Sequence, residues 1–100
     1  MEAVLGPLTS IPLGEGRNFK VQGACIAVFR ARDGELFATQ ATCPHRGGPL
    51  ADGILGAAKL VCPLHSSTFD LRTGQAVVGD FGLEIYPIKL NSDGQLVVSI

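Results

Sequence analysis

Short runs of Val, Ile, Leu and Phe, separated by Gly, Pro, Asn and Asp, extend along most of this chain. Apolar runs of this length between turn-forming residues are typical of an antiparallel all-β domain. No amphipathic segment of helical length stands out, so we expect little helix. The expected strands lie near Thr9–Ile11, Asn18–Val21, Cys25–Arg30, Leu36–Thr39, Lys59–Val61, Thr68–Asp70, Glu84–Leu90 and Gln95–Ile100.

Two Asp-Gly dipeptides, Asp33-Gly34 and Asp93-Gly94, lie between expected strands. Both residue types tolerate the positive φ that tight reversals require, so the dipeptides predict hairpin turns. Strands joined in this way follow one another as meanders.

The pattern changes between Thr42 and Ser66, where Gly and Pro are frequent. Lys59–Val61 is the one short strand expected in this part, and it leads directly into Cys62. We therefore predict a subdomain of two loops over residues 42–66, inserted into a single domain of residues 1–100. The remaining strands form the base that holds the two loops in register.

Composition narrows the choice of function. A chain of 100 residues, 46% of them hydrophobic, supports one modest core and leaves no room for a second, catalytic domain. The formal net charge is −1 and no run of Lys or Arg is present. These features argue against binding to nucleic acid or to an anionic membrane surface.

The segment Met1–Pro7 has neither a basic start nor a long apolar run, and no stretch approaches the roughly 18 apolar residues of a membrane span. Three cysteines cannot form a framework made only of disulfides, which agrees with a reducing compartment. We expect a cytoplasmic, soluble protein that does not associate with a membrane.

Cysteine and histidine occur together twice, as Cys43-x-His45 and, 16 residues further on, as Cys62-x2-His65. Both pairs lie among Pro and Gly, as expected for tight turns that aim side chains at one point. Two thiolates and two imidazoles suit tetrahedral zinc. They equally suit a two-iron, two-sulfur centre in which histidines replace the cysteines on one iron.

These two boxes resemble the cluster-binding boxes of Rieske iron–sulfur proteins, and the segments Gly34–Thr39, Phe69–Gln75 and Ile85–Ile88 are similar to soluble Rieske ferredoxins. The resemblance implies an antiparallel β-sandwich base with an inserted cluster-binding subdomain. It also implies one [2Fe-2S] cluster. Its ligand set would place Cys43 and Cys62 on one iron and His45 and His65 on the other.

Residues near the boxes predict the reduction potential. In quinol-oxidising Rieske subunits, an extra cysteine pair stands at the positions of Gly47 and Leu64, and a tyrosine that reaches a ligand sulfur stands at Phe69. Ser67 matches a serine whose hydroxyl donates to a bridging sulfide. Because three of these four positions lack the feature that raises the potential, we predict an intermediate-to-low value within the Rieske range of about −150 to +300 mV.

Three further expectations concern apolar residues and one loop. Leu50 and Leu64 are expected to screen the cluster from water and to form an apolar docking tip. The stretch Gly79–Gly82 matches a third loop that covers the cluster in the family, but it lacks the usual proline. Cys25 lies in an apolar run and is expected to be a small, buried core residue.

No histidine is present besides His45 and His65, which excludes a separate mononuclear iron site built on histidines. The resemblance therefore implies an electron-transfer protein, monomeric and not itself an enzyme. It would accept electrons from a flavin-dependent reductase and pass them to a terminal oxygenase or reductase. One alternative is a small Rieske subunit of an assimilatory nitrite reductase. The other is a zinc-stabilised interaction module.

Overall fold

The computed structural model of the chain describes residues 2–42, 49–62, 67–78 and 82–100. Within these ranges, no helix is long and apolar enough to cross a membrane. The strands are β1 (Glu2–Pro7), β2 (Glu15–Val21), β3 (Ala24–Arg30), β4 (Leu36–Gln40), β5 (Ile54–Gly56), β6 (Lys59–Val61), β7 (Thr68–Asp70), β8 (Ala76–Val78), β9 (Ile85–Tyr86), β10 (Ile88–Leu90) and β11 (Gln95–Ser99). Two 3-10 turns accompany them, η1 (Leu8–Ser10) and η2 (Leu50–Asp52).

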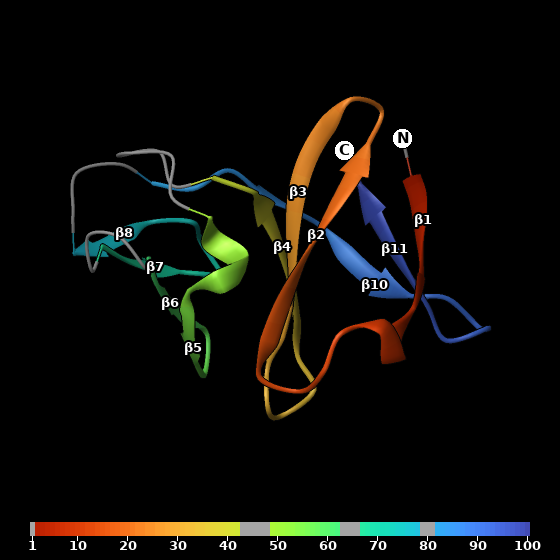
Figure 1. Ribbon diagram of the computed structural model, residues 1–100, viewed down its shortest axis with the longest axis horizontal. Helices are drawn as coiled ribbons and strands as arrows, with labels where there is room; N and C mark the ends of the chain where they lie inside the picture. The colour runs from red at the N-terminus through yellow and green to blue at the C-terminus, as the bar shows by residue number, and fades with distance from the viewer. Residues whose placement is uncertain (1, 43–48, 63–66, 79–81) are drawn as a thin grey trace.

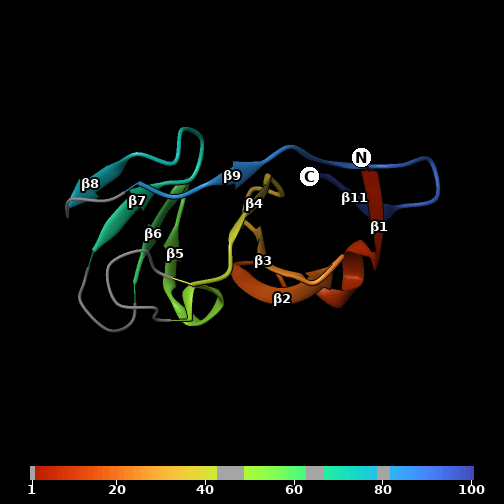
Figure 2. The ribbon, with the colours of Figure 1, turned by 90° about the horizontal axis from the view of Figure 1, so that it is seen from above.

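The strands form three antiparallel sheets (Figure 1). The two base sheets have the strand orders β1-β11-β10 and β2-β3-β4-β9. The third, which we call the small sheet, consists of β5, β6, β7 and β8 in chain order. Figure 2 shows the small sheet at one end of the molecule and the strands β1 and β11 at the other. The predicted antiparallel all-β fold is confirmed.

Two apolar clusters hold the sheets together. The base cluster includes Ile26, Val28, Leu96 and Val98. The junction cluster joins β3 and β4 to the small sheet and consists of Ala27, Phe29, Ala31, Phe37, Leu50, Ala58, Leu60, Cys62, Phe69, Leu71 and Leu83. Alternate residues of β3 contribute to the two clusters, so both faces of this strand are buried, which explains why its sequence is an unbroken apolar run.

The two predicted Asp-Gly turns are present. Gly34 and Gly94 have φ values of 92° and 75°, and their amides donate to the carbonyls of Ala31 at 2.8 Å and Asn91 at 3.1 Å. The strands β2-β3-β4 and β5-β6-β7-β8 are meanders, as expected. The pairing of β1 with β11 is different, because it brings together the two ends of the chain.

The predicted strand near Thr9–Ile11 is wrong. This segment overlaps the 3-10 turn η1, where the amide of Ile11 donates to the carbonyl of Leu8 at 3.1 Å and the Ser10 hydroxyl donates to the carbonyl of Pro7 at 2.7 Å. The strand lies just before it, at Glu2–Pro7. A side-chain hydroxyl that bonds to a local carbonyl favours such a turn over a strand.

Three strands were not predicted, namely β1, β5 and β8. The last two are only three residues long and contain too few residues to show an alternating pattern. The expected strand Glu84–Leu90 is instead two strands interrupted at Pro87, which has no amide hydrogen for a sheet. One part pairs with β4 and the other with β11.

Cys25 is exposed, so its predicted place in the core is wrong. The pairing of β3 with β4 begins at Ile26, opposite Gln40. Cys25 pairs only with Lys20 of β2, on the part of the β2–β3 hairpin that extends beyond β4. An apolar run in the sequence does not reveal where the neighbouring strand ends.

Candidate metal centre

The second box lies between the adjacent strands β6 and β7. Cys62 directly follows β6 and Ser67 directly precedes β7, and the amide of Cys62 donates to the carbonyl of Ser67 at 2.8 Å. The register continues through Val61 opposite Thr68 and Leu60 opposite Phe69. The β-hairpin therefore holds the two residues that flank segment 63–66 at a fixed distance.

The first box is flanked by a second antiparallel contact. Thr42 and Pro49 form an isolated bridge, and the amide of Leu50 donates to the carbonyl of Ala41 at 3.0 Å. The turn η2 then begins at Leu50. Like the second box, the first one is flanked by paired backbone. The sequence motif included Pro49 but gave no sign that Thr42 would pair with it.

The flanks of both boxes meet in the junction cluster, because Leu50 and Cys62 are both part of it. The Cys62 thiol is free of any disulfide and its residue is only 1% exposed. A thiolate buried among apolar side chains suits a soft metal site that water does not reach. Cys43, His45 and His65 lie outside the described residues. The donor set of two thiols and two imidazoles fits the [2Fe-2S] cluster that the resemblance to Rieske proteins implies.

The neighbouring residues that the structure describes are buried. Ser67 is 5% exposed, and Phe69 lies in the junction cluster on the same side of the small sheet as Leu60. Leu50 has no exposed surface, so its predicted place in an apolar docking tip is wrong; it packs in the core instead. Gly47 and Leu64 lie outside the described residues.

The predicted third loop, Gly79–Gly82, is described only at its last residue, because residues 79–81 lie outside the described ranges. Leu83, which follows, is part of the junction cluster, and its amide donates to the carbonyl of Gly74 at 2.6 Å. The small sheet and Leu83, the second residue after segment 79–81, therefore pack in the same core as Leu50 and Cys62.

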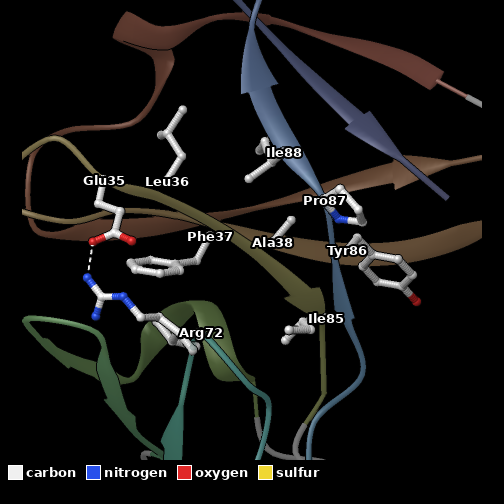
Figure 3. A pocket seen from close by; sticks show the side chains of 10 residues that line it. Glu35, Leu36, Phe37, Ala38, Arg72, Ile85, Tyr86, Pro87 and Ile88 are labelled. Carbon is white, nitrogen blue, oxygen red and sulfur yellow. Dashed lines mark hydrogen bonds and ion pairs between the residues drawn. The ribbon is translucent and has the colours of Figure 1, made fainter.

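An ion pair bridges the base and the small sheet beside a groove of about 450 Å³ (Figure 3). The Arg72 guanidinium, which follows β7, pairs with the carboxylate of Glu35, which precedes β4. The Arg72 Cζ atom also lies 5.9 Å from the centre of the Phe37 ring. Of the predicted site residues that the structure describes, Leu50, Cys62, Ser67 and Phe69 do not line this groove.

Known proteins with similar sequences and structures agree with this arrangement. The sequence model of the Rieske [2Fe-2S] domain matches residues 2–81. The ferredoxin component of naphthalene 1,2-dioxygenase/salicylate 5-hydroxylase systems from Ralstonia sp. is 36% identical over 87 residues, which cover 85% of this chain and 83% of that protein.

Two solved structures have a similar fold. The ferredoxin of carbazole 1,9a-dioxygenase from Nocardioides aromaticivorans IC177 has a TM-score of 0.87 and 25% identity, covering 99% of this chain and 97% of that one. A structure described as the putative NADH-dependent nitrite reductase small subunit from Mycobacterium tuberculosis has a TM-score of 0.90 at 21% identity, covering 98% and 93%. At that identity, the second similarity supports the fold alone. The matched sequence model and the Ralstonia relative together show that this chain belongs to the Rieske [2Fe-2S] domain family.

Proposed function

We propose that the protein is a one-electron carrier with a single Rieske-type [2Fe-2S] cluster. Cys43 and Cys62 would bind one iron, and His45 and His65 the other. When bound, a cluster of this kind supplies reversible one-electron transfer at a potential above that of four-cysteine clusters. The observation that carries the proposal is the buried Cys62 thiol, which forms no disulfide and lies in the same apolar cluster as Leu50, the residue that follows the first box.

The contribution of the chain is to hold ligands in place and to exclude water. Paired backbone flanks both boxes, at Thr42 with Pro49 and at Cys62 with Ser67. Leu50 and Phe69 are both at most 1% exposed and belong to the same apolar cluster as Cys62. A site kept rigid and dry in this way needs little rearrangement when its charge changes.

We infer the partners from the named relatives. The Ralstonia protein is a ferredoxin component of a dioxygenase system, so we propose a reductase as the electron donor and a terminal oxygenase as the acceptor. A flavin in the donor and a monomeric state of the carrier are parts of the same proposal. The cytoplasm remains its expected location.

The test is a redox titration of the purified protein at several pH values, combined with iron and acid-labile sulfide analysis. We expect two irons and two sulfides per chain and one reversible one-electron step of low to intermediate potential. A potential above roughly +150 mV, in the upper part of the Rieske range, would contradict a low-potential carrier. Colourless protein that contains zinc and no sulfide, even after iron–sulfur reconstitution, would instead support the interaction module.

A further inference from the structure

The turn η2 connects the two boxes in the described structure. It begins at Leu50, two residues beyond the segment of the first box that lies outside the described ranges. Gly53, β5 and β6 follow it, and Cys62 comes directly after β6. Figure 1 shows this turn as the yellow-green coil between the small sheet and β2. Any change in the position of η2 therefore changes the first box relative to the second.

Gly53 lies where η2 meets β6. A Cβ atom placed on Gly53 would lie 2.5 Å from the carbonyl oxygen of Val61, 3.0 Å from Cδ1 of Leu60 and 3.1 Å from the carbonyl oxygen of Leu50. Its φ of −72° and ψ of 172° are extended values that any residue adopts. Glycine is thus needed here for space and not for an unusual backbone conformation.

The two carbonyl groups next to Gly53 belong to residues that flank the two boxes. Leu50 follows the first box, and Val61 immediately precedes Cys62. We propose that Gly53 is a positioning residue that sets the spacing between the two loops that hold the cluster. This inference rests on the proposed function, because it assumes that both loops bind one cluster.

A methyl group at Gly53 could not be accommodated by moving β6 alone. Val61 pairs with Ile54 on one side and with Thr68 on the other, so its backbone is held between two strands. The turn η2 would have to move instead. On its other side it packs against β2, where a Cβ on Gly16 would lie 3.2 Å from the carbonyl oxygen of Ala51. The displacement would therefore pass along the chain through Leu50 to the first box.

The test compares three variants of the cluster-loaded full chain. Gly53→Ala introduces the methyl group at the contact. Gly56→Ala is the matched control, because Gly56 lies in the adjoining strand and a Cβ there meets nothing within 4 Å. Val98→Ala removes buried volume from the base cluster, away from Gly53, and controls for a general loss of stability. Each protein is examined by electron paramagnetic resonance after reduction, by redox titration and by the rate of iron release to a chelator.

We expect Gly53→Ala to shift the g values and the midpoint potential and to release iron roughly ten-fold faster than Gly56→Ala, as overpacking of a close contact implies. The far-ultraviolet circular dichroism of Gly53→Ala and the fluorescence of Tyr86, which lies in the base, should be unchanged. Val98→Ala should lower the melting temperature without shifting the g values.

Three results would overturn the inference. They are identical spectra and iron release for Gly53→Ala and Gly56→Ala, the same spectral shift in Val98→Ala, or complete unfolding of Gly53→Ala, which would mean that Gly53 is needed for the fold as a whole. All three presuppose a wild-type protein that contains iron and sulfide. A wild-type protein without them would refute the proposed function itself.

Discussion

The backbone amide of Cys62 donates to the carbonyl of Ser67 at 2.8 Å, so the hairpin of β6 and β7 extends to the two residues that flank segment 63–66. This pairing uses only main-chain atoms. The position of Cys62, a proposed ligand, is therefore defined by the strand pair. Because the backbone positions Cys62, a substitution of its side chain should affect metal binding without affecting the fold.

Replacement of Cys62 by Ala should abolish cluster binding and leave the fold intact. The thiolate is lost, whereas the hydrogen bond to Ser67 is made by the backbone and remains. We expect iron and acid-labile sulfide to fall to nearly zero, with unchanged far-ultraviolet circular dichroism. Cys25→Ala is the control, because this exposed thiol lies in β3 and should leave the cluster content unchanged. A full cluster in Cys62→Ala would contradict the ligand assignment.

Replacement of Ser67 by Ala should lower the reduction potential. If the buried Ser67 hydroxyl donates to a bridging sulfide, it stabilises the reduced state by one hydrogen bond, about 1–1.5 kcal/mol, or roughly 40–65 mV for one electron. Redox titration of the loaded protein measures this shift. Ser92→Ala, in the exposed turn between β10 and β11, is the control. An unchanged potential in Ser67→Ala would mean that the hydroxyl does not contact the cluster.

The sequence predicted the parts of the fold whose signals are local. The predicted limits of Lys59–Val61 and Thr68–Asp70 agree with the observed ones, because each is a short strand next to the second box. Long-range features were not predictable in this way. The exposure of Cys25 depends on where β4 ends, and the burial of Leu50 depends on a core shared with β6 and β7.

The same distinction applies to the candidate site. The spacing of Cys and His predicts the donor set, since ligand chemistry is encoded in residue types, and that set stays a prediction. The close approach at Gly53 was not foreseen, because it depends on the carbonyl of Val61, which no pattern in the sequence connects with Leu50. A glycine with ordinary backbone angles gives no conformational signal.

The ion pair between Arg72 and Glu35 should contribute modestly to stability. Both side chains are more than a third exposed, so a double-mutant cycle in urea unfolding should give a coupling of about 0.2–1 kcal/mol that decreases at high salt. Arg72→Ala should cost more than Glu35→Ala, because only the arginine also contacts the Phe37 ring. The pair of Lys59 and Asp70, separated by 3.9 Å within the small sheet, should show a weaker coupling. Equal effects of the two single variants would argue against the ring contact.

Stability should fall at alkaline pH because of Tyr86. Burial, and secondarily the negative charge of Glu84, raises the pKa of the Tyr86 hydroxyl above its usual value of 10.0. In the unfolded chain the hydroxyl ionises at that usual value, so above about pH 10 the unfolded state binds fewer protons than the folded state and is favoured. The stabilising contribution is complete below this pH and is lost as the pH rises towards the folded-state pKa.

Urea unfolding of the wild type and of Tyr86→Phe between about pH 9 and 11 measures this effect. The chain has one tyrosine, so the variant removes all tyrosine ionisation, and its stability should decrease less steeply over this interval. Glu84→Gln should reduce the slope only in part, because burial is the larger cause of the shift. Parallel pH profiles for the wild type and Tyr86→Phe would show that the Tyr86 pKa is the same in both states.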